Sequence, residues 1–216
     1  MLFPLVVSLS VLTLAPAQAP AQAPAPTFEQ AATPGDCLKA AKAFSSKRQT
    51  ELRPLTVEKL KQIDDERIPQ EKTCAAKFNS AALSPADLVS LAEVYGDVGD
   101  ATRSAELMGA VRKHPKVTKV DVANVLALQI SNGMREPKSD ARNARLETIV
   151  DELDALGPEA FEQQWNAHAR MNGYYRGDDI DAGIIKHSTW IINAGATCKP
   201  EDRLRLAPTV ASAHVN

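Results

Sequence analysis

The sequence has few of the features from which membrane spans, sheets and nucleic-acid interfaces are built. Aromatic residues make up only 5% of the 216 residues, and no apolar run after residue 14 is long enough to cross a membrane. Lysine and arginine (25) nearly balance aspartate and glutamate (27), which gives a formal net charge of −2. A charge balance of this kind provides no basic surface for nucleic acid, so a nucleic-acid partner is not predicted.

Sequence signatures of catalysis are also missing. No G-x-S-x-G, P-loop or dinucleotide fingerprint occurs, and no two cysteines have the C-x-x-C spacing. Asp178, Asp179 and Asp181 resemble only a fragment of a calcium loop, and a solvated turn explains them better. No metal-ligand spacing joins the four histidines His114, His168, His187 and His214. We therefore predict no catalytic residue, metal site or cofactor, and an enzyme is the less favoured interpretation.

The first residues predict export. Leu2 to Leu14 form a short apolar segment, and small-x-small triplets follow it, as in a secretory signal peptide, although no lysine or arginine precedes the segment. We assign residues 1–17 to a signal peptide, with cleavage after Ala21 as a second possibility, and expect a periplasmic or extracellular protein. A disordered or interfacial N-terminus is the alternative. Residues 18–33 are rich in proline, alanine and glutamine and predict an extended linker.

The clearest structural signal lies between residues 84 and 115. Ser84 and Pro85 form a strong helix start, as N-cap and first helical residue. The apolar residues that follow recur at helical spacing: Leu88, Leu91, Ala92 and Tyr95. Gly99 and Asp100 form a turn, and a second helix runs from there to His114 and Pro115. The pattern predicts two short helices folded back on each other.

Helical patterns continue on both sides of this segment. We expect helices capped at Asp36 and Thr56, an end or bend at Pro69, and a third segment around residues 74–82. Residues 120–130 are apolar on more than one face, which also suits a buried strand, but a lone strand would have no partner. Further helices are expected over 139–156, 158–175, 180–191 and from residue 200 onward. The fold class is therefore predicted to be all-α.

The segment at 84–115 resembles a tetratricopeptide repeat. The large and small positions of that repeat are matched by Leu88, Leu91, Ala92, Tyr95, Gly99, Asp100 and Ser104. This resemblance implies an irregular stack of antiparallel helical hairpins, a TPR-like α-solenoid, over residues 34–216. It also implies a scaffold that binds a protein or peptide partner on a concave face. A generic pair of helices is the alternative, because any close helix crossing needs small residues.

The order of segments along the chain supports a second, weaker resemblance to a known family. An exported chain with a spacer, helical hairpins and the stretch YYRGDDIDAGIIKHSTWII at 174–192 resembles the helical N-terminal region of bacterial TlpA-like thiol–disulfide proteins. That resemblance implies an accessory region whose thioredoxin-family redox domain lies beyond residue 216. The last helical pattern stops at Asn216 without a capping glycine, so we expect the helical domain to be truncated there, with a missing partner element as the alternative.

Two groups of residues are candidates for a role beyond packing. Cys37 and Cys74 are expected to form a disulfide between the first helices, with three small buried cysteines as the alternative. His168 and His187 flank the same turn and could meet across it. Most of the larger aromatic residues lie in the same region, so either a ligand groove or a local core is expected from Trp165, His168, Tyr174, Tyr175, His187 and Trp190.

Overall fold

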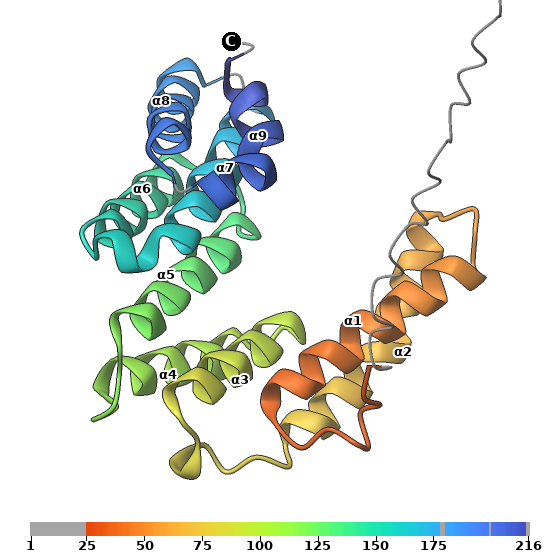
Figure 1. Ribbon diagram of the computed structural model, residues 1–216. Coiled ribbons are helices and arrows are strands. Elements are labelled where there is room, and N and C mark those ends of the chain that lie inside the picture. Colours follow the sequence, from red (N-terminus) through yellow and green to blue (C-terminus); the bar gives the residue numbers. More distant parts are fainter. Residues whose placement is uncertain (1–24, 178–179, 199, 215–216) are drawn as a thin grey trace, which may run out of the picture.

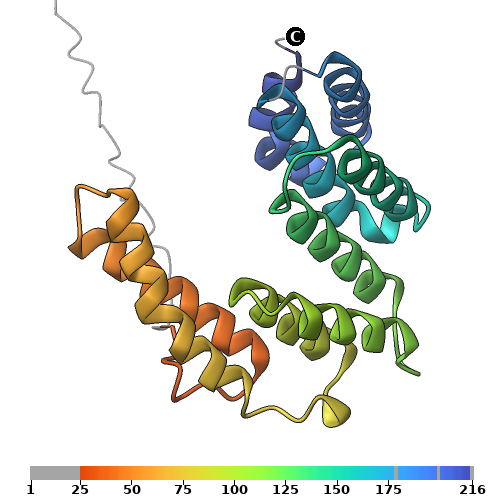
Figure 2. The same ribbon diagram turned by 180° about the vertical axis from the view of Figure 1, so that it is seen from behind.

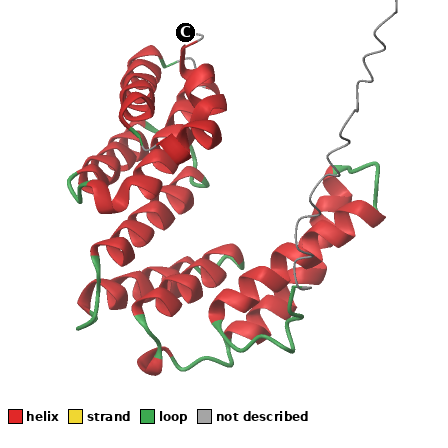
Figure 3. Cartoon of the chain, viewed as in Figure 1, coloured by secondary structure: helices red, strands yellow, loops and turns green. Residues whose placement is uncertain are grey.

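The computed structural model describes residues 25–177, 180–198 and 200–214. Within these residues, every regular element is a helix: nine α-helices and two short 3₁₀ helices, with no strand (Figure 3). The predicted all-α class is confirmed, and residues 120–130 lie in a helix. None of the described helices combines the length and the apolar character that a membrane crossing requires.

The helices follow one another with short connections. Their bounds are α1 (Pro34–Glu51), α2 (Val57–Ala75), η1 (Ser80–Ala82), α3 (Pro85–Asp97), α4 (Ala101–Lys113), α5 (Lys119–Met134), α6 (Asp140–Asp154), η2 (Pro158–Ala160), α7 (Phe161–Gly177), α8 (Asp181–Thr197) and α9 (Pro200–His214).

Side-chain caps explain where most of these helices begin. The hydroxyl of Ser84 accepts a hydrogen bond from the backbone N–H of Asp87, and Pro85 opens α3 as predicted. The predicted cap at Thr56 is also confirmed. The first helix differs from the prediction, because Thr33 rather than Asp36 is its N-cap. Asp36 is the third helical residue and completes a capping box, so the helix begins earlier.

The helix does not end at Pro69, one of the two outcomes predicted there. Helix α2 runs through this proline to Ala75, and Cys74 belongs to that helix rather than to a third segment. A proline inside a helix removes one backbone donor, and α2 continues without that hydrogen bond. The Gly99 turn, in contrast, ends α3 as expected. Its φ of 82° is a left-handed conformation that glycine adopts without strain.

The helices are arranged along a curved path, which the opposite views of Figures 1 and 2 both show. Consecutive helices contact each other, as in α1 with α2, α3 with α4, α5 with α6, and α7 with α8. Alternate helices also make contact: α1 with α3, α3 with α5, and α5 with α7. The core is correspondingly divided into three clusters that succeed one another along the chain.

Part of the predicted linker belongs to the folded chain. Phe28 and Ala31 are buried in the first core cluster, where Phe28 packs against Phe44. Lys77, which follows α2, donates hydrogen bonds to the carbonyls of Phe28 and Glu29. The predicted signal peptide (1–17), the rest of the linker up to residue 24, and Asp178 and Asp179 lie outside the described residues.

Candidate functional site

A hollow of about 830 Å³ lies along four alternate helices. Every residue that lines it belongs to α1, α3, α5 or α7, or is the C-cap of α5. Its lining combines apolar and amide side chains with charged groups, among them Ala86, Glu93, Asn124, Ser131, Asn166 and Arg170. A hollow of this volume is in the range of ordinary ligand pockets.

Polar contacts between neighbouring helices form part of this lining. The guanidinium of Arg135 donates to Asp97 at 2.8 Å and so joins the end of α5 to α3. The amide of Gln163 donates to Asn124 at 2.8 Å, which joins α7 to α5. Arg170 also bonds the hydroxyl of Ser131 across the same two helices. These contacts fix the spacing of the helices that line the hollow.

Glu93 is a charged group in the hollow without a direct partner. No described residue donates a hydrogen bond to its carboxylate. Partial burial raises the pKa of Glu93, while the nearby positive charges, Lys42 foremost, oppose that rise. The carboxylate is therefore available to a donor from outside the chain.

The hollow carries no excess of either sign. Its acidic residues are Glu93, Asp97 and Glu162, and its basic residues are Lys42, Arg135 and Arg170. The lining therefore has no net charge. The amides Asn124, Gln163 and Asn166 offer both donors and acceptors, which match the groups of a peptide backbone.

The structure joins Cys37 and Cys74 in a disulfide, with their Cα atoms 6.0 Å apart. Cys37 lies in the first turn of α1 and Cys74 at the end of α2, so the bond links the two helices near one end of the pair. Cys198 is a free, buried thiol at the end of α8. No group of three or more described His, Cys, Asp or Glu side chains is arranged to hold a metal ion.

The six residues expected in a ligand groove lie on α7 and α8. Trp165, His168, Tyr175 and His187 are buried, whereas Tyr174 and Trp190 are partly exposed. Their rings pack on one another: His168 stacks on Trp190 with centroids 4.0 Å apart, and His187 stacks on Tyr175 at 5.6 Å. The structure thus brings the six together in the core, and the groove stays a prediction.

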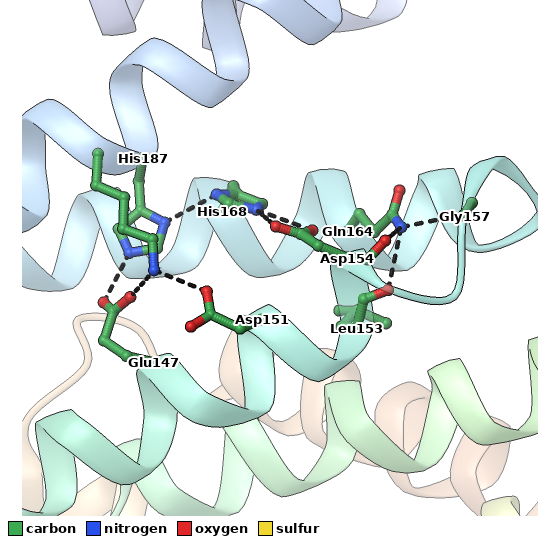
Figure 4. A network of polar contacts seen from close by, with 9 residues as sticks. Glu147, Asp151, Leu153, Asp154, Gly157, Gln164, His168 and His187 are labelled. Carbon is green, nitrogen blue, oxygen red and sulfur yellow. Dashed lines mark hydrogen bonds and ion pairs between the residues drawn. The ribbon is translucent and has the colours of Figure 1, made fainter.

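The two histidines meet, and each also contacts a carboxylate (Figure 4). Their Nδ1 atoms are 2.9 Å apart. His187 Nε2 lies 2.9 Å from Glu147, and His168 Nε2 lies 3.1 Å from Asp154. Both carboxylates come from α6, so the chain of contacts ties α6, α7 and α8 together.

Glu147 has the most hydrogen-bond partners among the residues in this line of contacts. Burial acts to raise its pKa, but hydrogen bonds from His187, Lys186 and Tyr175 together lower it to about 2. The same surroundings, burial first and then the bond to Glu147, raise the pKa of Tyr175 above its ordinary value. Glu147 is therefore an anion that accepts from three directions.

Sequence reasoning missed both carboxylates, although a signal for them was present. Glu147, Asp151 and Asp154 recur at spacings of four and three, so they form an acidic stripe along α6. Such a stripe usually indicates a solvated face. Here it borders the buried face that includes Leu146, Val150 and Leu153, and that position lets the acids reach α7 and α8.

The hollow was also missed, because its lining is spread over four helices and about 130 positions in the sequence. Comparison of the chain with protein-family models, with curated proteins and with solved structures finds no match.

Proposed function

We propose that the chain is a helical-repeat scaffold whose hollow binds a protein or peptide partner. The observation that carries the proposal is that α1, α3, α5 and α7 alone line the hollow. In this interpretation, each consecutive helix pair is an antiparallel hairpin of a TPR-like α-solenoid. The contacts between alternate helices support it, because they stack the first helix of each pair against the first helix of the next pair.

The lining supports a peptide partner in particular. Amide side chains from α5 and α7 match the donors and acceptors of a peptide backbone, and Glu93 offers an acceptor that no described residue uses. Small side chains such as Ala86 and Ala127 leave room between these groups. The fold itself suits many functions, so the proposal rests on this surface.

We also propose that the protein is exported. The predicted signal peptide supports this, and so does the Cys37–Cys74 disulfide, because such bonds persist in oxidising compartments. The accessory role beside a redox domain remains a second prediction. It requires coding sequence after Asn216 that contains C-x-x-C.

Binding in the hollow can be tested without knowing the natural partner. Peptides selected from a displayed random library on the full chain are measured against Ala86→Trp and Asn166→Trp, two exposed positions in the hollow on α3 and α7. Both variants should weaken binding at least tenfold, because an indole fills space that the peptide needs. Ala110→Trp, at an exposed position of α4 outside the hollow, is the matched control and should bind normally. Selected peptides that bind all three variants equally would contradict the proposal, as would a library that yields no binder.

A further inference from the structure

The contacts between the two buried histidines determine how many protons they carry. His168 is 1% exposed and His187 is fully buried. Their three hydrogen-bonding contacts form one line from Asp154, through the two rings, to Glu147 (Figure 4). An ionised carboxylate can only accept, so each Nε2 atom must carry a hydrogen to bond its carboxylate. The contact between the two Nδ1 atoms needs one hydrogen, carried by one of the two rings.

The line of contacts therefore needs three ring hydrogens. Two neutral imidazoles carry two, and two imidazolium ions carry four. With two hydrogens, either two lone pairs face each other across 2.9 Å or a lone pair faces a carboxylate. With four, two N–H groups face each other. Only one excess proton shared by the pair completes all three hydrogen bonds.

The surroundings favour this single positive charge. Two carboxylates of α6, Glu147 and Asp154, contact the pair. The ammonium group of Lys186 on α8 bonds Glu147 and a third carboxylate of α6, Asp151. Tyr175 of α7 is the remaining titratable neighbour and donates to Glu147. Three carboxylates against one ammonium leave a local excess of negative charge, which a protonated imidazole reduces.

Each ring of the pair stacks on an aromatic face and contacts a carboxylate. His187 stacks on Tyr175 and its Nε2 bonds Glu147, while His168 stacks on Trp190 and its Nε2 bonds Asp154. Burial and then the charge of its neighbours, including His187, lower the pKa of His168, although Asp154 opposes this. When His187 carries the excess proton, His168 is neutral and its hydrogen is on Nε2. Gln164 donates to the backbone carbonyls of Leu153 and Gly157, which precede and follow Asp154 in the sequence. These bonds fix the backbone that positions Asp154 for its contact with His168.

We propose that the His168–His187 pair is a buried binding site for one proton, and that this proton holds α8 against α6 and α7. Loss of the proton removes one of the three hydrogen bonds, so that either the two Nδ1 lone pairs face each other or a carboxylate faces a lone pair. Gain of a second proton sets two N–H groups and two charges against each other. The site goes beyond the proposed peptide binding, because it lies in the core between α6, α7 and α8.

A one-proton site of this kind should make the stability of the chain pass through a maximum as the pH changes. On this proposal, the completed line of hydrogen bonds makes the folded chain bind one proton more tightly than the unfolded chain does. That contribution is complete below the unfolded histidine value of about 6.5 and is lost as the pH rises through the folded value. The second proton binds more weakly in the folded chain. Stability therefore also falls as the pH drops from about 6.5 toward that lower value. The contribution of the pair is greatest near pH 6.5.

Nitrogen spectra of the histidine side chains test the proton count directly. The variant H114Q/H214Q removes the other two histidines of the chain and leaves the pair intact. At pH 7 we expect one ring with hydrogens on both nitrogens and one neutral ring with its hydrogen on Nε2. Two neutral rings or two imidazolium ions at this pH would overturn the proposal.

Amide hydrogen exchange along α8 tests the consequence. After correction for intrinsic exchange, opening of α8 should increase about tenfold per pH unit above pH 6.5, until the pair becomes neutral. His168→Gln keeps one donor and one acceptor, so it should preserve this dependence, whereas His187→Leu should abolish it. A wild-type chain whose α8 opening does not change between pH 6.5 and 8.5 would contradict the proposal, because a purely structural pair would give that result.

Discussion

At the scale of single residues, the structure contains a buried carboxylate that is only partly satisfied. Glu71 is fully buried in α2, where Arg67 bonds one of its oxygens and no described residue bonds the other. Burial raises its pKa to about 7, and the carboxylates of Asp97 and Glu93 on α3 add to this rise, while Arg67 opposes it. Glu71 therefore changes charge near neutral pH.

The raised pKa predicts that Glu71 destabilises the fold as the pH rises. Its favourable contribution is complete below the unfolded value of about 4.5 and is lost as the pH rises through about 7. Glu71→Gln should therefore stabilise the chain by about 1–3 kcal/mol at pH 8 and by much less at pH 5, as measured by denaturant unfolding. The same change at exposed Glu106 is the control. An equal effect of Glu71→Gln at both pH values would contradict this account.

A single glycine determines how closely α8 approaches α7. A Cβ atom on Gly183 would overlap the ring of Tyr175, which bonds Glu147. Gly183→Ala should lower the free energy of unfolding by about 1–3 kcal/mol, because the ring has to move. Gly173, in α7, has open space around it, so Gly173→Ala should stabilise the chain by about 0.5–1 kcal/mol. If Gly183→Ala and Gly173→Ala changed the free energy of unfolding equally, the close contact between Gly183 and Tyr175 would be unimportant.

At the scale of the element, helix ends were the most predictable part of the chain. Ser84, Thr56 and Gly99 have the expected roles, because caps and left-handed turns depend on a few neighbouring residues. Two helix boundaries were misjudged: Thr33 caps α1 earlier than Asp36 would, and α2 continues through Pro69 instead of ending there.

The disulfide belongs to this scale because it joins two helices. Cys37 and Cys74 are separated by 37 positions, a loop for which chain entropy predicts a contribution of about 3–4 kcal/mol. The double variant C37A/C74A should lose about this much stability in denaturant unfolding. The native chain should gain the mass of two hydrogen atoms on reduction, and so should the control Cys198→Ala. An unchanged mass would contradict the bond.

At the scale of the whole molecule, what the sequence could not predict is the assembly of distant helices. His168 and His187 flank one turn, so their meeting was foreseeable. Glu147 reaches them from a separate helix, and the hollow takes residues from α1 as well as α7. These juxtapositions depend on how successive helices pack, and no local pattern encodes that packing.

The whole molecule has two distinct regions, the hollow and the core around the two histidines. Helix α7 presents Asn166 and Arg170 to the hollow, while His168 contacts α6 and α8 in the core. Peptide binding and proton binding can therefore be tested separately: a change in one region should leave the other readout unchanged.

The most direct test of the central claim is a hydrogen-exchange footprint of the full chain with and without a selected peptide. If the hollow is the binding site, protection should increase along α3, α5 and α7 and should be unchanged along α4 and α6, whose residues do not line it. Protection confined to α4, α6 or α9 would contradict the claim, because the partner would then occupy a different face of the molecule.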